Sequence, residues 1–257
     1  MCQLMGMSAN VPTDAQFSFT GLIERGGGTD IHRDGWGIVF YRGRGIHEFR
    51  DPQPGFDSDI ARLVKVSGIK SKTVISHIRR ANVGNIRIEN THPFVRELWG
   101  NYWTFAHNGQ LRGAKKELAL GRFRPVGTTD SEHVFCWMLG RISAAFCDRP
   151  DSGKKLSRLI ADLSAQLNEF GVCNFLMSDS RFIYAHCSSR LHWITRRAPF
   201  GVARLKDLEM TVDFSAETTE KDVVTIIATE PLTRDERWHL IDKGKLMIWK
   251  DGRTQSF

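Results

Sequence analysis

The chain has 257 residues, of which 41% are hydrophobic and 25% charged, a composition ordinary for a globular protein with a substantial core. It contains no run of about 18 uncharged apolar residues, so no transmembrane helix is predicted. Its start lacks the basic and apolar regions of a signal peptide. These two absences favour a cytoplasmic location. Five cysteines without a CxxC pair argue against both a disulfide framework and a structural zinc site.

The net charge of +7 raises the question of nucleic-acid binding. The basic residues, however, stand in ones, twos and short mixed clusters, such as Arg196-Arg197. Without an arginine-rich tract or a basic helix face, a nucleic-acid partner is not expected. No membrane partner is expected either. A solvated basic surface, or attraction for small anionic substrates, explains the charge equally well.

The first predicted helix lies within residues 12–28. Thr13 and Gln16 have the spacing of a capping box, apolar residues follow on one helical face, and three glycines end the helix. A hairpin is predicted next, with strands over 36–41 and 46–49. The later predicted elements are a helix over 57–66, strands over 73–78 and 102–106, helices over 131–146 and 156–170, and strands over 174–178, 182–186, 192–195, 223–228 and 246–249.

No linker, repeat or low-complexity segment interrupts these elements, so residues 1–257 are expected to form one domain. Helices early and in the middle of the chain, together with many short strands, indicate layered sheets covered by helices.

Met1-Cys2 is the first chemically informative feature. Initiator methionine is readily trimmed when the second residue is small, which would expose Cys2 as the first residue of the mature chain. Such a residue combines a thiol nucleophile with an α-amino group, whose reference pKa of about 8 suits a general base. A cysteine can also stand at position 2 without a role, so this feature needs support from elsewhere in the sequence.

Three further segments place polar residues at the ends of predicted elements. Arg79 and Arg80 follow one predicted strand, Asn108 and Gly109 follow another, and Asp130 stands at a predicted helix start. Each has an ordinary alternative, which is a solvated arginine pair, a turn dipeptide or an N-cap. Their combination decides between these interpretations.

The segments occur in the order Met1-Cys2, S-H-I-R-R-A-N-V-G (76–84), N-T-H-P-F (90–94), A-H-N-G (106–109) and T-D-S-E (129–132). In this order and spacing, the sequence resembles the glutaminase domain of class II glutamine amidotransferases, which are N-terminal nucleophile hydrolases. The resemblance to the small stand-alone, YafJ-like members extends over the whole chain. It includes D-G-W-G-I (34–38), L-H-W-I-T-R-R-A-P-F-G (191–201) and A-T-E-P-L (228–232).

The resemblance implies an α+β fold, a four-layer α/β/β/α sandwich with two stacked, mainly antiparallel sheets covered by helices. It also implies roles for five residues. Cys2 matches the nucleophile, with its own freed amine as base, and Asn108 and Gly109 match the oxyanion hole, where paired N–H donors are effective. Arg79 matches the residue that holds the α-carboxylate of glutamine, and Asp130 matches the partner of its α-ammonium group. The implied reaction cleaves the γ-amide of glutamine through a γ-glutamyl thioester and releases ammonia and glutamate.

Two positions depart from the better-known members. These carry an aromatic residue directly after the binding arginine and often a threonine two positions later, where this sequence has Arg80 and Asn82. We expect both residues to bind substrate. The positive charge of Arg80, in place of an aromatic side chain, favours a donor with a further carboxylate.

Three functions therefore stay open. The first is a glutaminase or amidotransferase, with a separate acceptor or synthase subunit as a possible partner. The second is a hydrolase of γ-glutamyl, glutathione-like peptides with the same mechanism. The third is a non-catalytic subunit that binds γ-glutamyl ligands.

His77, His92 and His107 recur in the same segments and invite a test for a metal site. Zinc needs three or four convergent ligands, yet no HxH or HExxH spacing is present. Packed or hydrogen-bonded structural histidines are therefore expected. Neither a metal nor an organic cofactor is required by the implied reaction.

Overall fold

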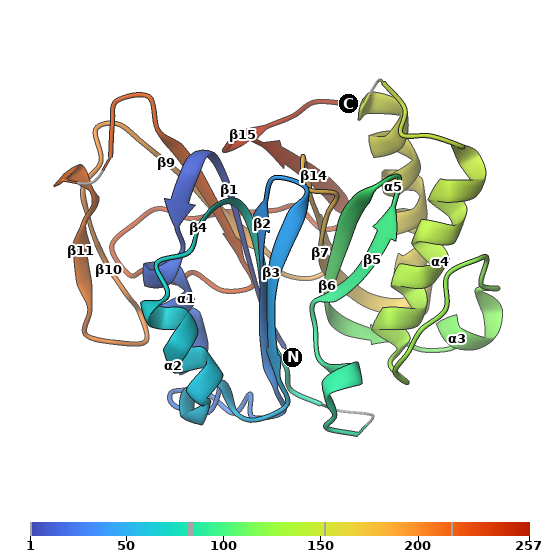
Figure 1. Cartoon of the computed structure of the whole chain (residues 1–257), viewed down its shortest axis with the longest axis horizontal. Helices are drawn as coiled ribbons and strands as arrows, with labels where there is room; N and C mark the ends of the chain where they lie inside the picture. The colour runs from blue at the N-terminus through green and yellow to red at the C-terminus, as the bar shows by residue number, and fades with distance from the viewer. Residues whose placement is uncertain (1, 82–84, 152, 217) are drawn as a thin grey trace.

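Two stacked β-sheets form the centre of the computed structural model, which describes residues 2–81, 85–151, 153–216 and 218–257 (Figure 1). The seven-stranded sheet has the order β13 (His239–Leu240), β9 (His192–Arg197), β12 (Val223–Ala228), β1 (Gln3–Asp14), β4 (Lys70–Ile78), β2 (Trp36–Arg42), β3 (Gly45–Asp51). The six-stranded sheet has the order β15 (Arg253–Thr254), β14 (Lys245–Lys250), β8 (Ile183–Cys187), β7 (Gly171–Ser178), β6 (Asn101–Leu111), β5 (Phe94–Leu98). Neighbouring strands are antiparallel throughout both sheets.

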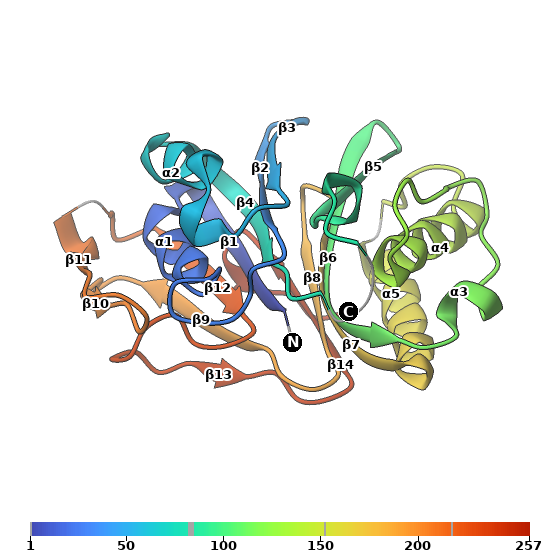
Figure 2. The same ribbon diagram turned by 90° about the horizontal axis from the view of Figure 1, so that it is seen from below.

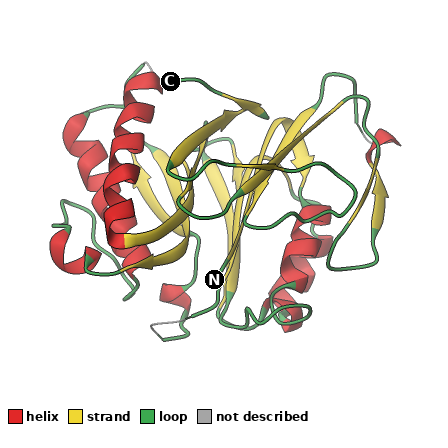
Figure 3. Cartoon of the chain, turned by 180° about the vertical axis from the view of Figure 1, so that it is seen from behind, coloured by secondary structure: helices red, strands yellow, loops and turns green. Residues whose placement is uncertain are grey.

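Helices cover the outer face of each sheet, which confirms the predicted α+β sandwich of four layers (Figures 2 and 3). On the seven-stranded sheet lie α1 (Gln16–Glu24) and α2 (Asp59–Val66), and on the six-stranded sheet lie α4 (Asp130–Ala145) and α5 (Gly153–Leu167). The smaller elements are α3 (Ala114–Glu117), the hairpin β10 (Val202–Arg204) and β11 (Thr211–Asp213), and 3₁₀ turns at Gly55–Asp57, Ile88–Asn90, Asn168–Phe170 and Phe214–Ala216. In the described part of the chain, no helix combines the length and hydropathy needed to cross a membrane.

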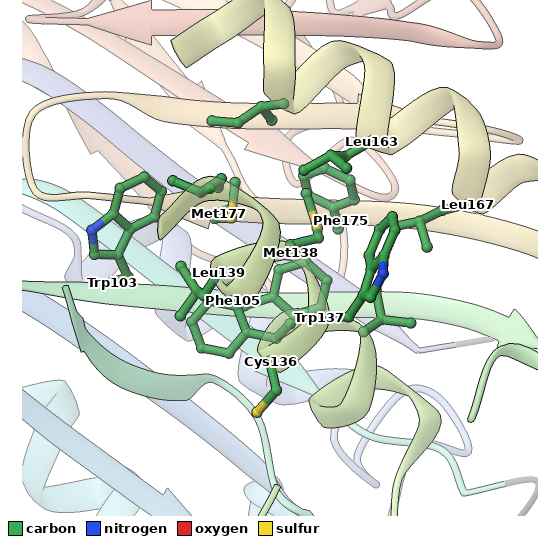
Figure 4. Packing of buried hydrophobic residues seen from close by; sticks show 14 of the residues in the cluster. Trp103, Phe105, Cys136, Trp137, Met138, Leu139, Leu163, Leu167, Phe175 and Met177 are labelled. Carbon is green, nitrogen blue, oxygen red and sulfur yellow. The ribbon is translucent and has the colours of Figure 1, made fainter. Parts of the chain in front are cut away.

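Apolar side chains fill the space between successive layers. Met5 of β1 packs with residues of α1 against the outer face of its sheet, whereas the adjacent Leu4 points to the other sheet and packs with Leu176. Met5 and Leu4 belong to two apolar layers, one under α1 and one between the sheets. A third apolar layer joins β6 and β7 to α4 and α5, with Phe105 and Phe175 at its centre (Figure 4). Because successive residues of a strand point to opposite faces, a central strand such as β1 is buried on both.

The predicted helices and strands are present, with their ends shifted by a few residues. Strand β1, by contrast, was not predicted, and it includes the region assigned to the start of the first helix. The predicted capping box is wrong: the hydroxyl of Thr13 donates to Val11 O (2.9 Å), and the amide of Gln16 donates to Asp14 Oδ1 (2.6 Å). Thr13 cannot cap the helix because it still belongs to the strand.

Candidate active site

The start of β1 places Cys2 against the end of β4. Gln3 is paired with Ile78, so the cysteine lies beside the two residues that follow β4. The sulfur accepts a hydrogen bond from the amide of Arg80 (3.3 Å), and the thiol lies 3.5 Å from the carbonyl oxygen of the same residue. The strand register thereby brings together two predicted site residues that are 78 positions apart.

The environment of the Cys2 thiol favours its neutral form. Burial raises the pKa of the thiol, while the Arg80 amide and the Arg79 guanidinium act in the opposite direction and Asp34 adds to the increase. Because the raised pKa leaves the sulfur protonated near neutral pH, a nucleophilic Cys2 needs a base to take its proton.

Arg79 carries a buried positive charge, since only 4% of the residue is exposed. Its backbone continues the β4–β2 ladder, because its amide donates to Gly35 O (2.8 Å). The guanidinium donates to Asn85 O (3.1 Å). Within residues 2–81, 85–151, 153–216 and 218–257, no carboxylate forms an ion pair with it. Buried charges in proteins are usually paired, so this site is suited to an incoming anion.

The two residues that depart from the better-known members are placed differently. Arg80 is exposed, and its backbone lies against the Cys2 sulfur. Asn82 lies outside the described residues.

Asn108 lies inside β6 and not in a turn, because β6 continues to Leu111. Its side-chain Nδ2 donates to Cys2 O (2.5 Å) and lies 3.4 Å from the hydroxyl of Thr229. Its backbone oxygen accepts a hydrogen bond from the side chain of Asn174 on β7 (3.1 Å). Among the described residues, the buried Oδ1 of Asn108 has no hydrogen-bond partner. The side-chain amide is therefore held beside Cys2, and its oxygen is available to accept a further hydrogen bond.

Gly109 follows on the same strand and is paired with Cys173 of β7. A Cβ atom at this position would lie 1.8 Å from Val172 O, far inside van der Waals contact. The close approach of the β7 backbone therefore requires a glycine here, whereas its φ is not positive.

Asp130 is the first residue of α4 and not its N-cap, which corrects the N-cap interpretation of the sequence. Thr129 caps the helix by accepting from the amide of Glu132 (3.1 Å). The Asp130 carboxylate instead accepts from the amides of Leu111 (2.8 Å) and Ser131 (2.9 Å), which fixes it beside β6. In the described part of the chain it has no hydrogen bond to Cys2 or Arg79.

The three histidines are buried near one another, His77 on β4, His92 before β5 and His107 on β6. The rings of His77 and His92 are 4.2 Å apart, and His107 Nδ1 lies 2.8 Å from Ser131 Oγ. Burial lowers the pKa of all three, that of His77 to about 3, so they are neutral near pH 7. Among the described residues, no group of three His, Cys, Asp or Glu side chains is arranged to hold a metal ion.

Two residues that the sequence did not single out also belong to the site. Asp34 Oδ2 accepts from the amide of Ala81 (2.6 Å) and so holds the segment after Arg80, and Thr229 contacts Asn108. Both lie in segments, D-G-W-G-I and A-T-E-P-L, that carry the family resemblance, which was the only signal for them.

A separate cavity of about 360 Å³ opens between β3 and β5. None of the described candidate site residues lines it. Its walls are formed by Glu48, Arg50, Ile88, Glu89, Phe94, Val95, Arg96, Val126 and Glu132.

Two antiparallel sheets stacked between helical layers, with a cysteine directly before a central strand, define an α+β sandwich. The family model "Glutamine amidotransferases class-II" matches residues 1–257. The chain therefore belongs to the class II glutamine amidotransferase family.

Individual relatives agree with this assignment. The chain is 57% identical over 249 residues to the protein YafJ of Escherichia coli (strain K12), which is provisionally named a glutamine amidotransferase, and 97% of each chain is covered. A crystal structure of a predicted glutamine amidotransferase from Pseudomonas aeruginosa PA01 has a TM-score of 0.79 and 49% identity, with all of both chains covered. The allosteric regulatory enzyme of purine biosynthesis has a TM-score of 0.62 at 15% identity, covering 99% of this chain and 48% of that one. At that identity the likeness concerns the fold alone.

Proposed function

We propose that this protein is a glutamine amidotransferase or glutaminase in which Cys2, after removal of Met1, attacks the γ-amide of glutamine. The single observation that carries the proposal is the meeting of three segments. The sulfur of Cys2 accepts from the amide of Arg80, and the carbonyl of Cys2 accepts from the side chain of Asn108. Family membership supports the same reaction class.

In the first step, the thiol of Cys2 gives its proton through a bridging water to the freed α-amine. The raised pKa of the thiol makes this transfer necessary. The sulfur then bonds to the carbonyl carbon of the γ-amide. The C–N bond breaks, and the departing nitrogen takes the proton and leaves as ammonia. Water hydrolyses the γ-glutamyl thioester, which releases glutamate and restores the thiol.

The oxyanion that forms in both steps needs donors beside the sulfur. Asn108 Nδ2 lies next to Cys2, and the backbone amide of Gly109 is the second donor. Preorganised N–H groups of this kind lower the barrier because they need no rearrangement during the reaction. Losing one of them costs about two to three powers of ten in rate.

Charged side chains recognise the amino-acid part of the substrate. The buried guanidinium of Arg79 would pair with the α-carboxylate, in keeping with its lack of a carboxylate partner among the described residues. Asp130, fixed beside β6, would pair with the α-ammonium group. Arg80 and Asn82 would line the same pocket.

The fate of the ammonia depends on a partner. The purine-biosynthesis enzyme is a longer chain, of which this one covers 48%. A separate acceptor subunit would supply the remaining chemistry here, and without one the protein would act as a simple glutaminase. We place the reaction in the cytoplasm, where five free cysteines would stay reduced.

A second candidate function, hydrolysis of γ-glutamyl peptides, is favoured by Arg80. The backbone of Arg80 lies against the Cys2 sulfur and its side chain is exposed, so the guanidinium could pair with the additional carboxylate of such a donor. Substitution Arg80→Ala is then expected to lower kcat/KM for a γ-glutamyl peptide about tenfold or more and for glutamine only slightly. Equal losses for both donors, or a clear preference of the native protein for glutamine, argue against the peptide.

The main test compares Cys2→Ala with Cys147→Ala, which removes an exposed free thiol elsewhere. We expect ammonia release from glutamine and a trapped thioester adduct in the native protein and in Cys147→Ala, and neither in Cys2→Ala. Intact-mass measurement of protein from its native source tests the loss of Met1. Ammonia release that survives Cys2→Ala excludes the mechanism, and permanent retention of Met1 favours a non-catalytic ligand-binding role.

A further inference from the structure

Thr229 connects the two sheets at the candidate active site. It follows β12, only 4% of it is exposed, and it lies opposite Leu4 of β1. The amide of Leu4 donates to Thr229 Oγ1 (2.9 Å), and the amide of Thr229 donates to Leu4 O (3.1 Å). The hydroxyl therefore fixes the backbone two residues after the nucleophile.

The same hydroxyl oxygen also faces Asn108. Its distance from Asn108 Nδ2 is 3.4 Å, while Cys2 O holds that nitrogen at 2.5 Å. These two oxygens determine the orientation of the amide, because the flipped side chain would set its own oxygen against the carbonyl oxygen of Cys2.

The unequal distances leave one N–H of the Asn108 side chain available to bind an oxyanion. The N–H that faces Cys2 O is engaged at short range, whereas the contact with Thr229 is long and weak. An oxyanion, being a stronger acceptor than a hydroxyl, can take over the loosely held N–H without moving the amide. Thr229 thus orients the N–H group of Asn108 but binds it too weakly to compete with an oxyanion.

The backbone around Thr229 is itself fixed. Its carbonyl oxygen lies 2.9 Å from Nδ1 of His192, and the buried guanidinium of Arg25 donates to Glu230 O (3.3 Å) and Pro231 O (2.7 Å). Because this backbone segment is held in place, the hydroxyl of Thr229 has a fixed position relative to Leu4 and Asn108.

We propose that Thr229 is a positioning residue, which sets the distance between the nucleophilic Cys2 and the oxyanion donor Asn108. This inference rests on the proposed function, since it assigns Thr229 a part in the same reaction. Among the described residues, the hydroxyl of Thr229 contacts Leu4 and Asn108, and Thr229 acts through these two neighbours.

The test uses Thr229→Val, which keeps the shape and removes the hydroxyl, and Thr229→Ser, which keeps the hydroxyl. The matched control is Thr225→Val on β12, the strand that Thr229 follows; the buried hydroxyl of Thr225 contacts Thr195 (2.6 Å) and Gly252 O (2.9 Å), away from the site. Should Thr229→Val fold poorly, Thr229→Ala leaves room for a water to satisfy the Leu4 amide.

Thr229→Val is expected to lower kcat for ammonia release from glutamine about tenfold to a hundredfold, the effect of slight misplacement, with KM within about twofold. Thr229→Ser should restore kcat, and Thr225→Val should leave it unchanged. A native kcat in both Thr229→Val and Thr229→Ala, or an equal fall in Thr225→Val, overturns the proposal.

A second measurement separates this inference from the proposed function. The side-chain amide resonance of Asn108, identified by its loss in Asn108→Ser, should move in Thr229→Val and stay in place in Thr225→Val. If the native protein releases no ammonia, the proposed function fails, while the movement of the resonance still decides whether Thr229 holds the amide. An unmoved resonance refutes that role.

Discussion

At the scale of single residues, Asn108 and Gly109 are adjacent on β6 and are constrained in different ways. Asn108 carries a side chain whose amide reaches Cys2 O. Gly109 carries none, because the carbonyl oxygen of Val172 on β7 occupies the space where a Cβ would lie. The identity of Gly109 is therefore required by packing alone, independently of any part its amide plays in catalysis.

Substitution Gly109→Ala is expected to destabilise the fold by about 2 kcal/mol or more, because a backbone atom 1.8 Å away cannot move aside as a side chain can. Gly201→Ala is the control, since nothing lies within 4 Å of its Cβ position, and it should change stability by less than about 0.5 kcal/mol. Urea unfolding measures both. Equal midpoints for the two variants would contradict the close approach of β7.

Asp130 offers a prediction about substrate recognition. Loss of its charge in Asp130→Asn removes a charge-assisted contact with the α-ammonium group, which is worth about 1.5–3 kcal/mol and corresponds to roughly a tenfold to hundredfold rise in KM for glutamine. Glutaramate, which has the same γ-amide but no amino group, serves as the internal control. Its KM should not change, because Asp130 has nothing to bind in it. A parallel rise for both substrates would show that the carboxylate only holds Leu111 and Ser131 in place.

At the scale of elements, the sequence predicts the four longer helices and most strands longer than four residues, but not α3, β1 or β5. Strand β1 is buried on both faces, so it lacks the alternation of apolar and polar residues that marks a half-buried strand. Strand β5 lies at the edge of its sheet, and its short, partly polar sequence gives little signal. The Asn-Gly pair in β6 has the composition of a turn, yet the partner strand β7 extends β6 through it.

The candidate site was predictable only where a motif carried it. The resemblance indicated Cys2, Arg79, Asn108 and Asp130, and the strand register now brings Cys2 next to the Arg79–Arg80 and Asn108 segments. The role of Thr229 could not be predicted, because its contact with Leu4 joins residues 225 positions apart in the chain. Such contacts follow from the pairing of β12 with β1, which no local pattern encodes.

His77 on β4 and His92 in the loop before β5 are buried, and this makes stability depend on pH. Burial lowers the pKa of His77 from 6.5 to about 3 and that of His92 well below 6.5, with His107 and Arg79 opposing protonation of both. Between pH 6.5 and about 3 the unfolded chain thus binds more protons than the folded one. Stability is fully present above pH 6.5 and falls as the pH falls.

From pH 6.5 to pH 5, His77 alone is expected to cost about 1.5 kcal/mol of the free energy of unfolding, and His92 lowers it further. Urea titrations at both pH values measure it. The variant His77→Gln should lose less stability over this interval than the native protein, whereas His47→Gln, on the edge strand β3, should behave as the native protein does. An identical loss in native protein and His77→Gln would show that other groups cause the pH dependence.

At the scale of the whole molecule, neither sheet is built from one continuous stretch of chain. The first strand, β1, lies in the middle of the seven-stranded sheet, and β14 near the C-terminus belongs to the six-stranded one. The turn after β14 also contacts the other sheet, because the amide of Gly252 donates to Ser8 Oγ (3.0 Å) and its carbonyl accepts from Thr225 Oγ1 (2.9 Å). The C-terminal hairpin therefore links both sheets.

A chain that ends at Asp242 should not fold cooperatively. It lacks β14 and β15 and, with them, the fully buried Trp249 between the sheets and Ile248 against α5. Loss of one buried tryptophan side chain costs about 3–5 kcal/mol, and whole domains are stable by only about 5–15 kcal/mol. A chain that ends at Gln255 loses only two exposed residues and should melt as the full chain does. Circular dichroism on heating compares the two, and a cooperative transition in the shorter chain, within a few degrees of the full one, would mean that the two sheets do not depend on the C-terminal hairpin.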